Sequence, residues 1–326
     1  MLSDRPTCLV LSGAGGRLPY LSAVAGVIKK ALEDEGIEIA AYAGDSAGAI
    51  VSAWLASDVD FKELTIFDKK DNLSRHARIG GSICRVISHV YYMLKDGGII
   101  SSPKVFKKAI NKPNFFPKPL SKPCYVNAFS LTQGKEVVCN LQDMSPEAWK
   151  KFCIGSCCIP AVFTPFPFDE NDYPDYIKDV FPDEHRFGKD MLVDGGLASY
   201  FPADFVLGVP ELKKRNPLII GIILDDPSPG HNPGVEKEPF HKIVARGCMA
   251  AITSNVHEDI EDVYDAGLDL EIVYAPAPDK WADYTTQFHY EHSEAIAFYK
   301  AGVEAAEKLL PDLLKRIKAK LVLSDG

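Results

Sequence analysis

A serine flanked by glycines is the residue of this sequence whose type and spacing most directly suggest chemistry. Gly44-Asp45-Ser46-Ala47-Gly48 matches the pattern G-x-S-x-G, in which the two glycines allow a sharp turn from a strand into a helix and expose the serine hydroxyl. An apolar run over 37–43 precedes it, and an Ala-, Ile- and Val-rich segment over 47–56 follows. We therefore expect Ser46 at the positive end of a helix, where developing negative charge is stabilised.

A nucleophilic serine also needs donors that stabilise an oxyanion. Residues 12–16, Ser-Gly-Ala-Gly-Gly, follow the predicted strand over 7–11, and backbone N–H groups without large side chains can converge there on one oxygen. The alternative, a dinucleotide-binding G-x-G-x-x-G loop, requires glycine where the sequence has Leu18, and it leaves Ser46 unexplained. The glycine loop is therefore interpreted as an oxyanion site.

The base that activates the serine is not evident among the eight histidines, which are His76, His89, His185, His231, His241, His257, His289 and His292. None follows a triad pattern, and none forms H-E-x-x-H, so zinc has no support. Asp194 ends a short apolar segment over 191–193 and begins Asp194-Gly195-Gly196. Taken alone, this pattern is typical of an ordinary turn aspartate.

The elements that must position these residues alternate along the chain. A strand over 7–11, a helix over 21–32 closed by Gly36, a strand over 37–43 and a helix over 47–56 indicate a parallel βαβ unit. Further patterns predict a helix over 83–94 stopped by Gly97-Gly98, a hairpin over 124–141, a helix over 146–157 capped by Ser145, strands over 218–224 and 268–274, and a helix over 241–263. A last helix over 292–320 is expected to be kinked or divided by Pro311.

Composition places the chain among globular proteins. Of its 326 residues, 46% are hydrophobic and 25% charged, and no run approaches the ~20 apolar residues of a membrane helix. We expect a single domain over 1–326 with its core at about 7–310, no signal peptide and a cytoplasmic location. Eight cysteines without a C-x-x-C pair predict reduced, buried thiols.

Charge is uneven along the chain. The net charge is −9, yet residues 62–122 hold 13 Lys and Arg against four Asp and Glu. The net negative charge of the chain disfavours nucleic acid as a partner, whereas the basic segment leaves peripheral contact with an anionic membrane open. Lys104–Lys122 with Phe115 and Phe116 is one candidate docking segment; the last helix is another, although packing against the core is favoured for it. An acidic stretch over 169–190 is predicted to be an exposed insertion.

Four motifs in order resemble the patatin-like phospholipase family. Ser12-Gly-Ala-Gly-Gly-Arg17 is similar to the family's oxyanion loop, and Gly44-Asp-Ser-Ala-Gly48 to its nucleophile elbow. Ser156-Cys-Cys-Ile-Pro160, continuing through Phe163 and Pro165, resembles the stretch before its last catalytic element, and Asp194-Gly-Gly196 its catalytic aspartate motif. The resemblance implies a three-layer α/β/α sandwich with a mainly parallel sheet, and hydrolysis of fatty acyl esters of glycerophospholipids without metal or cofactor.

The resemblance also implies roles for residues. Ser46 would attack the ester and Asp194 would take its proton, with oxyanion donors at the amides of Gly13, Ala14, Gly15 and Gly16. Arg17 would face a lipid phosphate or else form a surface salt bridge. An acyltransferase that uses the same acyl-enzyme, and a non-catalytic lipid-binding scaffold, are the alternatives.

Two positions depart from the family pattern. Ala14 and Leu18 stand where the family commonly has glycine. If either position requires a positive φ, its side chain costs roughly 1–2 kcal/mol in strain and alters the orientation of the loop amides.

Overall fold

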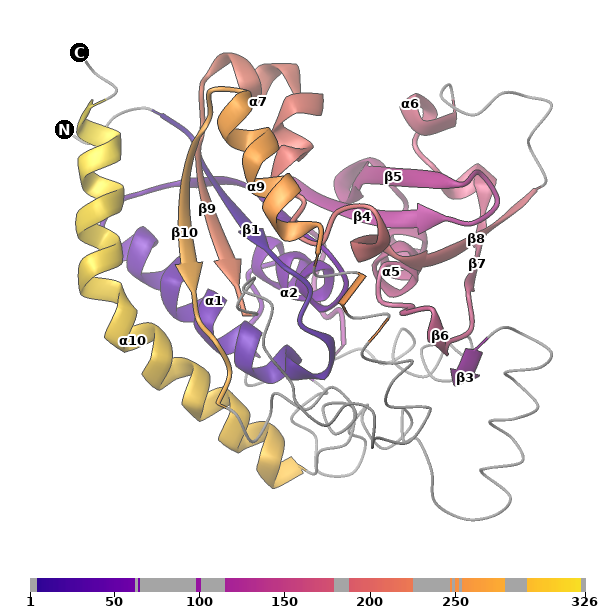
Figure 1. The fold of residues 1–326 in the computed structure, drawn as a ribbon, viewed down its shortest axis with the longest axis horizontal. Helices are drawn as coiled ribbons and strands as arrows, with labels where there is room; N and C mark the ends of the chain where they lie inside the picture. Colours follow the sequence, from indigo (N-terminus) through magenta and orange to yellow (C-terminus); the bar gives the residue numbers. More distant parts are fainter. Residues whose placement is uncertain are drawn as a thin grey trace.

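The computed structural model describes residues 5–61, 64, 98–100, 115–178, 188–224, 247, 250–251, 254–278 and 292–323 (Figure 1). The helix predicted over 83–94 and most of the basic segment lie outside these residues, as do Cys84 and Cys248. The other six cysteines are buried and form no disulfide, as predicted. Within the described part of the chain, no helix combines the length and apolar character needed to cross a membrane.

A central eight-stranded sheet carries the fold. Its spatial order is β10 (Asp269–Tyr274), β9 (Leu218–Ile223), β1 (Thr7–Leu11), β2 (Ile39–Gly44), β4 (Cys124–Ser130), β8 (Lys189–Asp194) and β7 (Phe166–Asp169), with β5 (Lys135–Asn140) also paired to β4. The neighbours from β10 to β4 are parallel, whereas β5 and β8 run antiparallel to β4, and β7 runs antiparallel to β8. Every residue of β1 and β9 is buried, which explains their continuous apolar sequences.

Helices cover the sheet in two layers, as expected. One layer contains α1 (Leu18–Asp34), α2 (Ala47–Ala56), α5 (Pro146–Gly155) and α10 (His292–Leu323), which contact one another in the pairs α1–α10, α1–α2 and α2–α5. The chain crosses from β9 to β10 in the opposite direction to its path from β1 through β2 to β4. Right-handed crossovers therefore place α9 (Val256–Asp265) on the other face of the sheet (Figure 1). There α9 contacts the 3-10 helix η9 (Ala203–Gly208), and η9 packs against α7 (Pro210–Lys214).

Smaller elements connect these layers. β3 (Gly98–Ile100) and β6 (Ala161–Phe163) form a separate parallel pair, so Gly98 begins a strand. The remaining short elements are α6 (Asp175–Lys178), η1 (Gly15–Arg17), η5 (Leu141–Asp143), η6 (Glu170–Asp172) and η8 (Gly195–Leu197).

The ends of β2 and β8 meet along β4. Strand β2 runs parallel to β4 and its pairing ends with Gly44 beside Val126. Strand β8 runs antiparallel to β4 and its pairing ends with Asp194 beside Ala128. The two strands thus approach each other head-on, with Asn127 at the junction. This register brings Gly44-Asp45-Ser46 and Asp194 together across a large separation in sequence.

Some expectations need correction. Of the acidic stretch over 169–190, the structure describes 169–178 and 188–190, and these parts are not simply exposed, because Tyr173 and Ile177 are buried and Asp190 is a fully buried residue of β8. Helix α10 continues through Pro311 as one helix. Its Leu313 and Ile317 are buried, so packing against the core holds the segment helical despite the proline, and the favoured interpretation of this helix is confirmed.

Phe115 and Phe116 are also buried, so they are not available as an exposed lipid-docking pair. Their rings form a chain of aromatic contacts with Trp54 of α2 and Trp149 of α5. The Trp54 indole N–H donates to the Phe115 carbonyl at 2.6 Å. The segment therefore closes the layer over α2 and α5.

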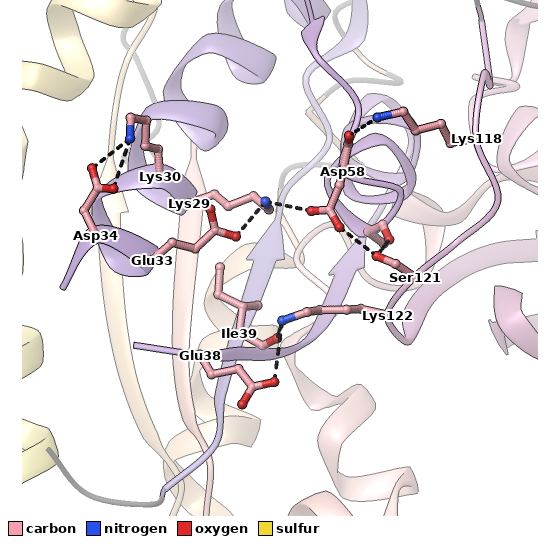
Figure 2. Close-up of polar contacts among 11 residues, drawn as sticks. Lys29, Lys30, Glu33, Asp34, Glu38, Ile39, Asp58, Lys118, Ser121 and Lys122 are labelled. Atoms are coloured by element: carbon pink, nitrogen blue, oxygen red, sulfur yellow. Dashed lines mark hydrogen bonds and ion pairs between the residues drawn. The ribbon is translucent and has the colours of Figure 1, made fainter. Parts of the chain in front are cut away.

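The lysines next to these phenylalanines bind the chain itself. Lys118 donates to the main-chain carbonyl of Asp58 at 2.7 Å, and Lys122 to that of Ile39 at 2.7 Å (Figure 2). The Asp58 carboxylate, just after α2, also pairs with Lys29 of α1 at 2.9 Å and accepts from Ser121 at 3.0 Å. These basic residues connect the ends of α1, α2 and β2.

Candidate active site

Ser46 lies at a strained turn between β2 and α2. Its φ of 52° and ψ of −122° are rare for a residue with a side chain. A Cβ on Gly44 would overlap the Gly48 carbonyl oxygen, and a Cβ on Gly48 would lie 2.5 Å from the Leu11 carbonyl oxygen. Both glycines of the pentapeptide are therefore required by close backbone contacts, and the turn presents Ser46 at the N-terminus of α2.

The end of α5 holds the main chain of both candidate catalytic residues. The Ser156 hydroxyl accepts from the Ser46 amide at 2.9 Å, and the Cys157 thiol donates to the Ser46 carbonyl at 3.0 Å. The Cys158 carbonyl accepts from the Asp194 amide at 3.0 Å. Three consecutive residues thus fix Ser46 and Asp194 relative to each other. The sequence marked this segment only by its resemblance, and no pattern indicated these contacts.

Asp194 is buried, with 1% of its surface exposed. Burial raises the pKa of its carboxyl from 3.8 to about 7, while hydrogen bonding by the Ser46 hydroxyl and the Gly196 amide lowers it in part. The Gly196 amide donates to Asp194 Oδ1 at 3.1 Å, but no donor forms a well-aligned hydrogen bond to Asp194 Oδ2. The contact from Ser46 is therefore loose, as catalytic hydrogen bonds often are before substrate binds.

The glycine loop is held from one side by Tyr200. The Gly13 amide donates to the Tyr200 carbonyl at 3.3 Å, and the Tyr200 hydroxyl donates to the Gly13 carbonyl at 2.6 Å. The Gly13 amide is thereby committed to Tyr200. No described main-chain carbonyl accepts from the amides of Ala14, Gly15 or Gly16, so these three amides are not committed in the same way.

Neither departure from the family pattern strains the loop. Ala14 has φ −142° and Leu18 has φ −44°, whereas the positive φ of 52° falls on Gly15. Arg17 is buried at 3% exposure, and its Nε donates to the Ala14 carbonyl at 3.2 Å. It therefore does not present an exposed charge, and its contact with a lipid phosphate stays a prediction.

The site contains a carboxyl that the sequence did not single out. Asp45 occupies a variable position of the pentapeptide, yet it is fully buried and neither carboxyl oxygen has a hydrogen-bond partner. Its neighbour Asn127 donates to Glu136 at 2.9 Å and to the Ser199 carbonyl at 2.8 Å. Among the described residues, no group of three or more His, Cys, Asp or Glu is arranged to hold a metal ion.

Three comparisons with known proteins bear on the family of this chain. No curated protein is similar enough to this sequence to be matched. The crystal structure of VipD from Legionella pneumophila is similar with a TM-score of 0.44 at 15% identity, over 95% of this chain and 67% of that chain. The family model described as patatin-like phospholipase matches residues 9–207, more than half of the chain and all four motifs. The chain belongs to the patatin-like phospholipase family, whose members are lipid acyl hydrolases.

Proposed function

We propose that this protein hydrolyses fatty acyl esters of glycerophospholipids or lysophospholipids through a Ser46–Asp194 dyad. The observation that carries the proposal is the head-on approach of β2 and β8 along β4. This approach supports the dyad because Ser46 follows the end of β2 in a strained turn and its hydroxyl makes a loose contact with the buried carboxyl of Asp194 at the end of β8.

In the first step, the Ser46 oxygen attacks the ester carbonyl while its proton passes to Asp194. An aspartate of ordinary pKa near 3.9 is a weak base for a hydroxyl, so burial that raises the pKa of Asp194 to about 7 improves the match. The negative charge moves from Asp194 to the substrate oxygen. The amides of Ala14, Gly15 and Gly16, together with the N-terminus of α2, are the donors proposed to stabilise it, at about 3 kcal/mol for each well-placed donor.

Collapse of this intermediate releases the alcohol, which takes the proton from Asp194, and leaves an acyl-enzyme on Ser46. Asp194 then removes a proton from water as the water attacks the acyl group. The fatty acid leaves and the proton returns to Ser46. Because the base must be ionised, kcat/KM should rise with pH through about 7.

The test uses vesicles that contain one phosphatidylcholine and its lyso form, with released fatty acid measured by mass spectrometry. Ser46→Ala and Asp194→Asn should each reduce release at least about a thousandfold without loss of folding. Ser52→Ala is the control, because this buried hydroxyl of the same helix donates to the Ala43 carbonyl at 2.7 Å and lies outside the dyad.

Three results would oppose the proposal. Wild-type turnover in Asp194→Asn would remove the dyad. Absence of both turnover and labelling of Ser46 by a fluorophosphonate in folded protein would favour a lipid-binding scaffold. Transfer of the acyl group to an added alcohol, in preference to water, would assign the acyl-enzyme to an acyltransferase.

A further inference from the structure

The buried carboxyl of Asp45 lies between the two loops that carry the proposed chemistry. A Cβ on Gly195, the residue after Asp194, would lie 2.6 Å from Asp45 Oδ1. A Cβ on Gly13, in the glycine loop, would lie 3.1 Å from Asp45 Oδ2. The carboxyl thus lies close to both glycines, next to the proposed base and the proposed oxyanion loop.

Unpartnered acceptors gather around this carboxyl. Both oxygens of Asp45, Oδ2 of Asp194 and Oδ1 of Asn127 are buried without a hydrogen-bond partner among the described residues. The Asn127 Cγ lies 2.7 Å from the same Gly195 Cβ position that Asp45 Oδ1 approaches, so the two side chains are neighbours. Asn127 cannot supply a donor, because its NH₂ group already donates to Glu136 and Ser199. Apart from the loose contact of the Ser46 hydroxyl with Asp194, these acceptors lack a donor, and a proton on Asp45 would supply one.

The surroundings also oppose a negative charge on Asp45. Within the described part of the chain, the ionisable groups that interact electrostatically with it include Asp194 from β8, Glu136 from β5, Asp259 from α9 and the Cys157 thiol after α5. Burial raises the pKa of Asp45 well above its ordinary value and the three acids raise it further, whereas the nearby Ser46 amide, which donates to Ser156, lowers it in part. An ionised Asp45 would also lie next to the loop whose amides must stabilise an oxyanion.

We propose that Asp45 is a positioning residue that stays protonated and donates a hydrogen bond to Asp194. The inference rests on the proposed dyad and deepens it. Before attack, the pair then carries one negative charge, on Asp194, and one proton, on Asp45. When the Ser46 proton reaches Asp194, both carboxyls are neutral and the charge lies on the substrate oxygen. Asp45 keeps its proton throughout, so it orients the base without competing for the transferred proton.

The experiment compares Asp45→Asn with Asp45→Ala in the pH dependence of kcat/KM, with a short-chain p-nitrophenyl ester as substrate. Asparagine keeps an uncharged donor of the same shape. In Asp45→Asn, the rise of kcat/KM at low pH (the acid limb of the profile) should therefore stay within about half a pH unit of wild type, with kcat reduced less than about fivefold. Alanine removes the donor, so its acid limb should move up by about half a unit or more, with kcat reduced at least about tenfold.

Two outcomes overturn the proposal. A downward shift of a unit or more in Asp45→Asn would mean that Asp45 is charged in the wild type, because removal of a like charge lowers the pKa of the base. Equal behaviour of the two variants would mean that no donor is needed. Asp190→Asn is the control. Asp190 is a buried acid of β8, the strand that ends at Asp194, and it accepts from Ser130 and Tyr173, both at 2.8 Å. This variant should leave the acid limb of the pH profile where it is in the wild type.

A second measurement does not depend on turnover. The infrared spectrum of the wild type at pH 8 should contain the band of a protonated carboxyl, which Asp45→Asn removes and Asp190→Asn does not. Absence of that band refutes the proposal even if Asp45→Ala fails to fold. Because this readout needs no catalysis, failure of the dyad in the vesicle assay and failure of the Asp45 assignment are distinguishable.

Discussion

At the scale of single residues, Tyr200 fixes the orientation of the glycine loop that we propose as the oxyanion site. Its hydroxyl donates to the Gly13 carbonyl, and that carbonyl shares a planar peptide group with the Ala14 amide. Because the C=O and N–H of a trans peptide point in opposite directions, fixing the Gly13 carbonyl also aims the Ala14 N–H. No sequence pattern indicates this role, since Tyr200 lies four residues beyond Gly196 in a segment of irregular structure.

We expect Tyr200→Phe to lower kcat about tenfold with little change in KM, because one oxyanion donor loses its orientation while the ring still fills its site. Steady-state kinetics with a short-chain ester would measure this. Tyr173→Phe is the matched control, because it removes a buried hydroxyl that donates to Asp190 at 2.8 Å. An equal loss of kcat in the control would attribute the effect to general destabilisation.

Ser156 offers a second prediction at the residue scale. Ser156→Ala leaves the Ser46 amide without its acceptor, which costs about 1–3 kcal/mol in a buried site, and it releases the strained turn. We expect lower stability in urea unfolding and at least about a tenfold lower kcat. The control is Ser145→Ala at the other end of α5, where the hydroxyl caps the Ala148 amide. It should cost about 1 kcal/mol with kcat unchanged; a similar loss of kcat there would contradict the role of Ser156.

At the scale of elements, the sequence predicted those parts that local chemistry determines. Strand β1, helix α2, the β4–β5 hairpin and the Ser145 cap of α5 all form where periodicity, turn residues and capping placed them. Sequence could not place Asp194 against Ser46, because that contact depends on two strands ending at one point of β4. Nor could it show that Phe115 packs into the core, since a Pro- and Lys-rich context is typical of exposed loops.

The close approach of α2 to β1 gives a prediction at this scale. Gly48→Ala puts a Cβ 2.5 Å from the Leu11 carbonyl and 2.6 Å from the Ser12 carbonyl, so α2 must move away from the sheet. We expect a loss of about 1–3 kcal/mol in urea unfolding together with most of the activity, because the same movement displaces Ser46. Gly208→Ala is the matched control, since nothing lies within 4 Å of its Cβ position. Equal stability of the two variants would contradict a close approach of α2 to β1 at Gly48.

At the scale of the whole molecule, buried acids tie stability to pH. Burial raises the pKa of Asp194, Asp259 and Glu136, each to about 7. In the unfolded chain these groups lose their protons near pH 4. Between pH 4 and 7 the folded state therefore binds more protons than the unfolded state, and stability falls as pH rises. Their contribution is fully present below about pH 4 and is lost as pH rises through about 7.

We therefore expect the free energy of unfolding to fall by a few kcal/mol between about pH 5 and 7.5, measured by urea titration at constant ionic strength. Asp259→Asn should flatten this slope because it removes one titrating group. The asparagine oxygen can still accept from the Phe201 amide, which donates to Asp259 at 2.8 Å. Asp175→Asn, at a carboxyl with 95% of its side chain exposed, should leave the slope intact. Stability that rises across this interval would mean that these acids are ionised in the folded protein, so the low-polarity setting inferred around Asp194 would be wrong.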